Sequence, residues 1–418
     1  MKLITSLPRG TRDILPEECK KWQYIEDVIR KTAQSFNLNE VRFPTFEHRA
    51  LFEHGVGDNT DVVQKEMYTF FDKGGREITL RPEGTSGVVR LVLENGLFAQ
   101  SLPQKLYYLI SCFRYEKPQA GRLREFHQFG IEFFGASDPS ADAEIISCAK
   151  TIFDNLKIKN LSLEINSIGC KECREKYYNA LREYFSSYSD DLCETCNSRL
   201  QKNPMRILDC KSQICSKIAD NAPKILDYIC DDCKNHFEGV KELLDIMNIK
   251  YTVNPHIVRG LDYYSGTVFE FVSNEIGAQG TVCGGGRYDG LSQIIGDQAL
   301  AGIGFAMGLE RILLLMEAQG IEFDTQPKSD IYFAYIGEKG KNEAIKQTLV
   351  LRRLGFSAET DIVGRGLKAQ MKYADKINAR YTVVLGDNEV EAQKAVIKDM
   401  QSGEKTEIEI EKIIEFLK

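Results

Sequence analysis

The sequence contains no uninterrupted apolar run of membrane-spanning length and no secretory leader pattern. Charged residues or prolines interrupt the segment from Met1 to Trp22 every few positions. A leader needs a continuous apolar stretch behind its first charges, and a spanning helix needs about 20 apolar residues. These absences argue against secretion and against membrane insertion. We therefore expect a cytoplasmic protein with no membrane partner.

The chain also lacks an excess of positive charge. Its net charge is −7 and its pI is near 5.6, which argues against nucleic-acid binding through a broadly basic surface. A polynucleotide would have to be bound by local patches. With 418 residues, of which 43% are hydrophobic and 28% charged, the chain can bury large cores and should form two or three domains.

The segment from Phe113 to Phe129 has the pattern of a strand, a basic turn and a returning strand. Four cations and one carboxylate lie between Arg114 and Arg124. Because an arginine fork suits bidentate binding of phosphate oxygens, one such residue at each end of the turn predicts a nucleotide site. A charged turn on an ordinary hairpin is the alternative interpretation.

Glu83 lies on a predicted turn between a strand and a helix. Glu77–Leu80 alternates like a strand, Pro82 ends it, and Thr85 or Ser86 can cap the helix that follows. Side chains on such turns commonly face a ligand cavity, where a carboxylate suits an ammonium group. The alternative is a carboxylate that stabilises the start of the helix. A second helix should begin after Asp138, which provides a proper cap.

Eight of the twelve cysteines lie between Cys170 and Cys233. They include three C-x-x-C pairs, Cys170/Cys173, Cys193/Cys196 and Cys230/Cys233. Without a leader, disulfides are disfavoured, and this spacing lets two thiolates bind one tetrahedral zinc ion. A structural zinc ion is therefore one interpretation, and free thiols in a small helical insertion are the other. His236 is the only histidine nearby, and it can equally be a surface residue.

Two further stretches flank a predicted strand at Val268–Val272. The first is Arg259-Gly-Leu-Asp-Tyr-Tyr264, and the second is Gly284-Gly-Gly-Arg-Tyr-Asp-Gly290. A glycine-rich strand and a helix start then follow at Ala301–Arg311. On its own this last pattern can mean only tight packing and a solvated arginine.

Taken together, these motifs resemble those of a known family. Phe113–Glu116 resembles the Phe-Arg-x-Glu element of class II aminoacyl-tRNA synthetases, and Ala301–Arg311 resembles their third motif. The two stretches around Val268–Val272 resemble the pair of signatures that distinguish histidyl-tRNA synthetases within the class. Leu7–Asp13 and Arg42–Glu47 resemble that family's start and its first motif, which usually builds a dimer interface.

This resemblance covers nearly the whole chain and implies its domain organisation. Residues 1–325 would form an α+β catalytic domain with the antiparallel sheet of class II synthetases, interrupted at about 168–250 by the cysteine-rich, largely helical insertion. After Pro327, strands such as Asp330–Tyr335 and Tyr381–Leu385 alternate with helices, which predicts a three-layer α/β domain at 328–418. The fold class is therefore α/β overall.

The C-terminal domain carries a basic helix face. Residues 364 to 380 contain five cations and one acid, and Arg365, Lys368, Lys372 and Lys376 recur at helical spacing. A solvated face is the plain interpretation. The position within the chain resembles the anticodon-binding domain of the synthetases, where phosphate contacts would hold tRNA.

The resemblance implies a histidine–tRNA ligase that joins L-histidine to ATP as an adenylate and then transfers the acyl group to tRNA(His). The substrate carboxylate is itself the nucleophile, so the site must align it and neutralise charge on the phosphoryl oxygens. Magnesium would bridge the ATP phosphates. A homodimer is implied as well, and a zinc ion is compatible with the insertion but not assigned.

The site residues follow from the same resemblance. Catalysis would rest on Arg114 and Arg259. The nucleotide would be bound by Arg114, Glu116, Arg122, Phe126 and Arg311. The amino acid would be bound by Glu83, Gly84, Thr85, Arg114, Gln128, Glu132, Arg259, Tyr263 and Tyr264, with Glu132 and Tyr264 facing the imidazole. The tRNA would be bound by Gln119, Arg124, Lys368 and Lys372.

Two other protein families are alternatives to this one. One is the synthetase-like regulatory paralogue that partners ATP phosphoribosyltransferase in histidine biosynthesis, a family that typically lacks the tail domain and parts of the catalytic signatures. Here Arg114, Arg259 and Arg311 are all present, together with a tail. The other is a threonyl, prolyl or glycyl synthetase, and the Arg259–Tyr264 stretch argues against it.

Overall fold

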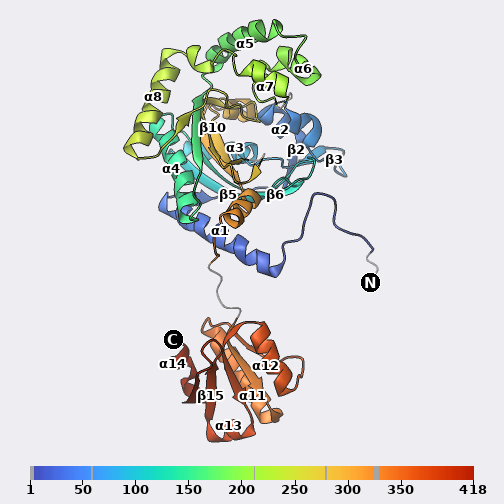
Figure 1. Cartoon of the computed structure of the whole chain (residues 1–418), viewed down its shortest axis with the longest axis vertical. Coiled ribbons are helices and arrows are strands. Elements are labelled where there is room, and N and C mark those ends of the chain that lie inside the picture. Colours follow the sequence, from blue (N-terminus) through green and yellow to red (C-terminus); the bar gives the residue numbers. More distant parts are fainter. Residues whose placement is uncertain (1–3, 58–59, 211, 278–279, 324–328) are drawn as a thin grey trace. The chain divides into compact units, whose positions relative to one another are not determined.

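The computed structural model describes residues 4–57, 60–210, 212–277, 280–323 and 329–418. The chain divides into two compact units, Met1–Phe323 and Asp324–Lys418 (Figure 1). Within the part of the chain that is described, we find no helix with both the length and the apolar character needed to cross a bilayer.

The first unit contains most of the helices and strands. In chain order these are α1 (Pro16–Ser35), β1 (Asn39–Glu40), β2 (Phe46–His48), α2 (Arg49–Val56), η1 (Val62–Glu66), β3 (Thr69–Phe71), β4 (Glu77–Leu80), α3 (Thr85–Glu94), η2 (Leu97–Ala99), β5 (Gln104–Phe113), β6 (Glu125–Phe134), α4 (Pro139–Asn155), β7 (Ser162–Ser167), α5 (Lys171–Ser186), α6 (Glu194–Lys202), η3 (Pro204–Ile207), α7 (Gln213–Ala219), η4 (Ile225–Asp227), α8 (Asp231–Ile246), β8 (Thr252–Val253), β9 (Ser265–Val272), β10 (Thr281–Arg287), α9 (Leu291–Gly296), β11 (Gly302–Gly308) and α10 (Leu309–Ala318).

An eight-stranded sheet organises this unit, with strand order β1-β5-β6-β11-β10-β9-β7-β8. The inner neighbours are antiparallel, and β1 with β5 and β7 with β8 are parallel. The predicted hairpin is confirmed as β5 paired with β6. The late strand β11 pairs with β6 and sets Gly304 opposite Glu132. Segments that are about 170 residues apart therefore become neighbours on one sheet.

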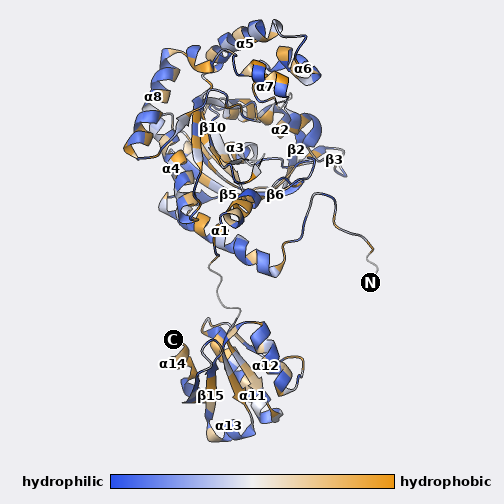
Figure 2. Ribbon diagram, in the orientation of Figure 1, coloured by the Kyte–Doolittle hydropathy of each residue, from blue (hydrophilic) through white to orange (hydrophobic). Residues whose placement is uncertain are grey.

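Alternation along the strands sends side chains to two separate cores. On one face, Phe129 and Phe269 pack with Ile29 of α1 and Ile145 of α4. On the other face, Tyr108 packs with the valines of α3. Figure 2 shows the strands largely hydrophobic and the outer helices striped, as expected for helices that bury only one side.

The segment predicted as an insertion is mainly helical. It contains α5, α6, α7 and α8, and Figure 1 shows the first three gathered over one end of the unit. The predicted helix after Asp138 is confirmed, because the Asp138 side chain accepts the Ser140 N–H at 2.9 Å at the start of α4.

The second unit contains β12 (Ser329–Tyr335), α11 (Gly337–Arg353), β13 (Ala358–Thr360), α12 (Leu367–Lys376), β14 (Ala379–Leu385), α13 (Asp387–Ala392), β15 (Lys394–Asp399), β16 (Lys405–Glu409), η6 (Ile410–Lys412) and α14 (Ile413–Leu417). Its five-stranded sheet has the order β13-β12-β14-β15-β16. Phe333 packs with α11 on one face, whereas Tyr332 packs with α12 on the other. The predicted three-layer arrangement is confirmed.

Candidate active site

A cavity of about 440 Å³ lies in the first unit, and it is lined by the central strands β5, β6, β9, β10 and β11 and by loops beside them. Twelve residues that the sequence analysis singled out line it, namely Glu83, Gly84, Thr85, Arg114, Glu116, Arg122, Phe126, Gln128, Arg259, Tyr263, Tyr264 and Arg311. They come from the α3 start, the β5–β6 hairpin, the loop before β9 and the α10 start. The sheet order is what brings these four regions together.

Arginines from several parts of the chain converge on the cavity, two of them from the β5–β6 turn. Arg114 donates from Nε to the carbonyl of Pro82 at 2.8 Å, and its guanidinium lies 5.3 Å from the Phe126 ring centre. Arg311 donates from Nη1 to the carbonyl of Thr281 at 2.6 Å. These contacts fix the direction in which each guanidinium faces the cavity.

Positive charge accumulates around Arg311. Burial, and then the nearby cations Arg122 and Arg114, lower the pKa of Arg311 from its usual range. Like charges held together in a partly buried cleft favour a polyanionic ligand, since binding relieves their repulsion.

Acidic partners hold two of the arginines in place. Arg259 forms an ion pair with Glu270, and although burial opposes it, this pairing raises the pKa of Arg259. Arg122 forms an ion pair with Glu116. Arg259 Nε is buried and has no acceptor among the described residues. These pairs fix the guanidinium groups before any substrate is present.

Glu83 stabilises the start of α3. Its carboxylate accepts the N–H groups of Thr85 at 2.6 Å and Ser86 at 2.9 Å. The prediction that Thr85 or Ser86 caps this helix is wrong, because the carboxylate before them satisfies the free amides. Each carboxylate oxygen still has a further acceptor position for an ammonium group.

Glu132 lies beneath the floor of the cavity rather than in its wall. It is 1% exposed, and its carboxylate accepts hydroxyl hydrogen bonds from Thr85 at 2.7 Å, Tyr108 at 3.3 Å and Tyr288 at 2.5 Å. A side chain on Gly304 would overlap this carboxylate. Burial raises the pKa of Glu132 to about 8.

This raised pKa predicts a pH-dependent stability. As the pH rises from about 4.5 to 8, the unfolded chain releases this proton while the folded chain retains it, so folding becomes less favourable. The measured quantity is the difference in melting temperature between Glu132→Gln and the parent, taken as variant minus parent. We expect this difference to become more positive from pH 5 to pH 8. One pKa unit corresponds to about 1.4 kcal/mol, so the effect should be of the order of a few kcal/mol.

Calorimetry at several pH values measures this difference. Glu183→Gln, at an exposed position on α5, is the matched control and should show a flat difference. A flat difference for Glu132→Gln would mean that Glu132 titrates in its ordinary range.

Tyr288, Glu310 and Arg206 are among the residues of the site that the sequence analysis missed. Tyr288 lies in the glycine-rich stretch Gly284–Gly290, and its hydroxyl donates to Glu132. The sequence analysis marked this stretch but assigned no role to Tyr288. Glu310 accepts the His127 N–H at 3.0 Å. Arg206 of the insertion lines the cavity and donates to the carbonyl of Gly260 at 2.7 Å, and no local pattern marks it.

The hairpin turn presents Gln119 to solvent, while Arg124 is engaged within the protein. Arg124 lies 3.7 Å from the Tyr115 ring centre, and its Nε donates to the carbonyl of Glu116 at 3.2 Å. Neither Gln119 nor Arg124 lines the cavity.

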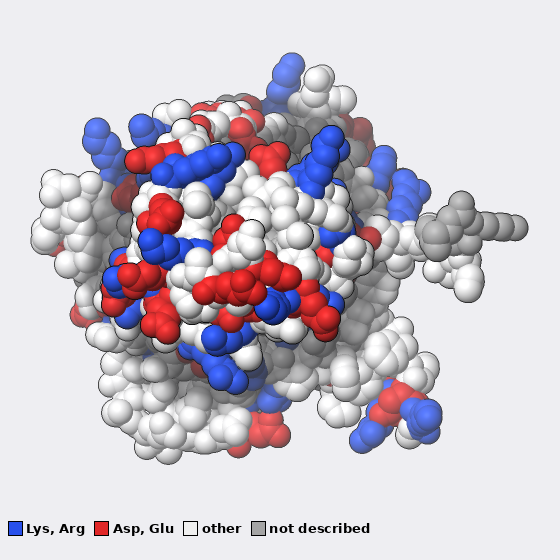
Figure 3. All heavy atoms as spheres, turned by 90° about the horizontal axis from the view of Figure 1, so that it is seen from below, with Lys and Arg blue, Asp and Glu red and all other residues white. Residues whose placement is uncertain are grey.

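In the second unit, α12 exposes Lys368, Lys372 and Lys376, whereas Arg365 is bound to Asp361 at 2.8 Å. The side chains of Lys368 and Lys372 are therefore accessible to the phosphates that they are predicted to contact. Figure 3 shows a face on which Lys and Arg side chains mix with Asp and Glu, in keeping with the net negative charge.

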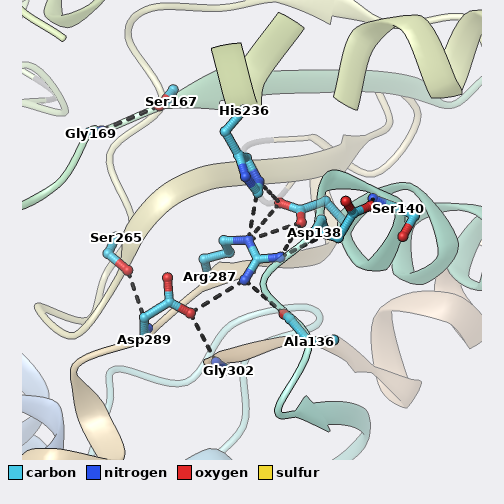
Figure 4. Close-up of polar contacts among 11 residues, drawn as sticks. Ala136, Asp138, Ser140, Ser167, Gly169, His236, Ser265, Arg287, Asp289 and Gly302 are labelled. Carbon is cyan, nitrogen blue, oxygen red and sulfur yellow. Dashed lines mark hydrogen bonds and ion pairs between the residues drawn. The ribbon is translucent and has the colours of Figure 1, made fainter. Parts of the chain in front are cut away.

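His236 belongs to a polar cluster around Arg287. Figure 4 shows its ring directed at that guanidinium, and His236 Nε2 lies 3.2 Å from Asp142 Oδ1. Arg287 and Asp142 form a buried ion pair at 2.6 Å. This cluster joins α8, α4 and β10, so His236 is neither a plain surface residue nor grouped with the cysteines.

Comparison with known proteins identifies the family. A family model described as histidyl-tRNA synthetase matches residues 10–312, and one described as anticodon binding domain matches residues 330–418. The chain belongs to the histidyl-tRNA synthetase family. It is therefore an aminoacyl-tRNA ligase.

Relatives match over essentially their full length. The chain is 56% identical over 416 residues to a histidine–tRNA ligase from Acetivibrio thermocellus, covering 100% of both chains. A histidine–tRNA ligase from Clostridioides difficile is 49% identical over 417 residues, covering 100% of this chain and 99% of that one.

Solved structures of the histidyl-tRNA synthetase family share the fold. The crystal structure of apo S. aureus histidyl-tRNA synthetase matches with a TM-score of 0.85 and 39% identity, covering 99% of this chain and 100% of that one. The predicted class II fold is thus confirmed. An ATP phosphoribosyltransferase regulatory subunit/histidyl-tRNA synthetase from Bacillus halodurans C, at 21% identity and a TM-score of 0.66, shows the fold alone.

Proposed function

We propose that this chain is a histidine–tRNA ligase that activates L-histidine with ATP and transfers it to tRNA(His). The observation that carries the proposal is the convergence of Arg114, Arg122, Arg259 and Arg311 on one cavity, in a member of the histidyl-tRNA synthetase family. A triphosphate is the substrate that such a set of forks suits best.

The arginines act on the phosphates of ATP. Arg114 and Arg259 bind the α-phosphate and stabilise the charge that builds on its oxygens as the histidine carboxylate attacks. Arg311 binds the γ-phosphate and aligns the pyrophosphate leaving group. Phe126 stacks on adenine, with Glu116 and Arg122 at its edge. No side-chain nucleophile takes part.

Histidine binds at the α3 end of the cavity. The Glu83 carboxylate, next to Gly84, binds the ammonium together with Thr85 and Gln128. Tyr263, Tyr264 and the buried Glu132 define the imidazole end. Hydroxyl groups of the cavity wall, held by Glu132 beneath them, can satisfy the ring nitrogens, whereas an apolar isostere would leave these hydroxyls unpaired.

Magnesium accompanies ATP in this proposal. The cavity carboxylates Glu116 and Glu270 are already paired with Arg122 and Arg259, and this fits an ion held mainly by phosphate oxygens and water rather than by a protein cage. When bound, the ion supplies further charge neutralisation at the phosphates.

Transfer RNA engages both units. Gln119 and Arg124 of the hairpin turn meet the acceptor end, and Lys368 and Lys372 of α12 contact the phosphates of the anticodon arm. The chain acts in the cytoplasm as a homodimer. Light scattering that finds a stable, active monomer would contradict the dimer.

The test is amino-acid-dependent exchange of pyrophosphate into ATP, run on the purified protein with each of the twenty amino acids. Exchange with histidine alone is the expected result. Exchange with a different amino acid would contradict the imidazole pocket, and the absence of exchange would favour a regulatory paralogue.

A chain that ends at residue 327 should lose most tRNA charging and keep histidine-dependent exchange. The reason is that the first unit is compact by itself and contains the whole cavity. Exchange and aminoacylation are measured on the same preparation. Equal loss of both activities would mean that the second unit is needed for the first to fold.

A further inference from the structure

The eight cysteines of the insertion form two separate groups. In the first group the sulfurs of Cys170, Cys173, Cys230 and Cys233 all lie within 4.8 Å of one another. This group joins the first and third C-x-x-C pairs, which are far apart in the sequence.

The second group consists of Cys193, Cys196, Cys210 and Cys215, and its sulfurs also lie within 4.8 Å of one another. It joins the middle C-x-x-C pair to two cysteines that belong to no such pair. The sequence spacing alone indicated neither this group nor the number of sites.

We propose that each group binds one structural zinc ion through four thiolates. Four sulfurs about 2.3 Å from a tetrahedral zinc ion are about 3.8 Å from one another. The Sγ atoms are 3.4 Å apart for Cys170 and Cys173, and 3.9 Å apart for Cys193 and Cys210. A disulfide would require about 2.05 Å, and all twelve cysteines are free thiols.

The backbone favours a thiolate at several of these cysteines. Cys170, Cys193 and Cys230 are the N-cap residues of α5, α6 and α8. The positive ends of these helices stabilise thiolate charge. The Cys230 N–H donates to Cys173 Sγ at 3.1 Å, and the Cys193 N–H donates to Cys215 Sγ at 3.3 Å. Such outer hydrogen bonds orient metal ligands.

The insertion is a segment that benefits from metal binding. Its middle part relies on short elements, with nine residues in α6, seven in α7 and four in η3. Short helices bury little apolar surface of their own, so a small subdomain commonly needs an additional link. An ion that binds only the folded form adds its binding free energy to folding.

The two zinc sites also support the substrate loop, a consequence that rests on the proposed function. Arg174, beside Cys173, donates to the carbonyl of Tyr264 at 2.6 Å. Arg206, between Cys196 and Cys210, donates to Gly260 at 2.7 Å. These bonds hold both ends of the loop that carries Arg259 and Tyr264. Zinc thus positions this loop through the insertion and has no chemical role in the reaction.

The first test is the metal content of the full-length protein, purified under reductant without chelating resins and measured by mass spectrometry. We expect about two zinc ions per chain. Cys170→Ser with Cys173→Ser should reduce this to about one, as should Cys193→Ser with Cys196→Ser, and Cys19→Ser outside both groups should retain two. Less than about one zinc ion per chain in the parent, stoichiometric iron with sulfide, or disulfides in these groups would overturn the proposal.

A second measurement does not depend on variants that fold. Cobalt(II) exchanged into the parent chain should give intense thiolate charge-transfer absorption and the visible bands of tetrahedral coordination at both sites. The absence of these bands, or bands typical of octahedral cobalt, would contradict the proposal. Neither result depends on adenylation, so failure of the zinc proposal and failure of the proposed function are distinguishable.

Hydrogen exchange then tests the link to the loop. Removal of zinc from the parent chain should speed amide exchange in residues 259–264 and leave β12 to β14 of the second unit unchanged. Unchanged exchange in the loop after zinc removal would overturn the positioning role.

Discussion

Replacement of Arg259 by alanine should lower the single-turnover rate of histidyl-adenylate formation by about 10²- to 10³-fold, which corresponds to about 3 to 4 kcal/mol. Arg259 is half-buried in the wall of the cavity and is already fixed by Glu270. Its charge costs no reorganisation during the reaction. ATP affinity should fall much less, because Arg114, Arg122 and Arg311 still bind the phosphates.

Rapid-quench kinetics and equilibrium ATP binding separate these two effects. Arg76→Ala is a matched control, since Arg76 is exposed on the β3–β4 turn. Glu270→Gln offers a second comparison, because it retains the Arg259 cation and removes its ion-pair partner. An unchanged single-turnover rate in Arg259→Ala would remove Arg259 from catalysis.

Glu132→Ala should abolish histidine activation while the protein stays folded. The substitution removes the acceptor of the Thr85, Tyr108 and Tyr288 hydroxyls. Buried hydroxyl groups without a partner reorient or admit water, and the imidazole end of the pocket loses its shape and its carboxylate. A loss of more than about 10³-fold in kcat/KM for histidine is expected.

Exchange kinetics with histidine, together with circular dichroism, test this prediction. Glu132→Gln keeps an acceptor but cannot ionise, and its activity should lie between those of the parent and the alanine variant. Glu183→Ala on the surface should behave like the parent. Histidine turnover at the parent level in Glu132→Ala would contradict the assignment of Glu132 to the pocket.

The chemistry of the site was largely predictable from local sequence. The guanidinium forks of Arg114 in the hairpin turn and of Arg311 at a helix start suit phosphate, and both residues line the cavity. Arg124 at the other end of the turn does not line it. Strand alternation predicted the β5–β6 hairpin, and the strand and helix order after Pro327 predicted the second unit. The α3 cap was wrong because Ser, Thr and Glu side chains compete for the same free amides, and only their geometry decides.

The sequence by itself therefore determined the family, the elements and the kinds of side chain that the site contains. Only the tertiary structure decided which of them meet, because the order β5-β6-β11-β10-β9 joins strands that are far apart in the chain. That order places Glu132 under Gly304 and within reach of Tyr288. Likewise, the folding of the insertion sorts the cysteines into two groups. The hydrophobic periodicity of a segment and the chemistry of its side chains are local properties. The burial of a side chain, its hydrogen-bond partners and its pKa depend on packing between distant segments.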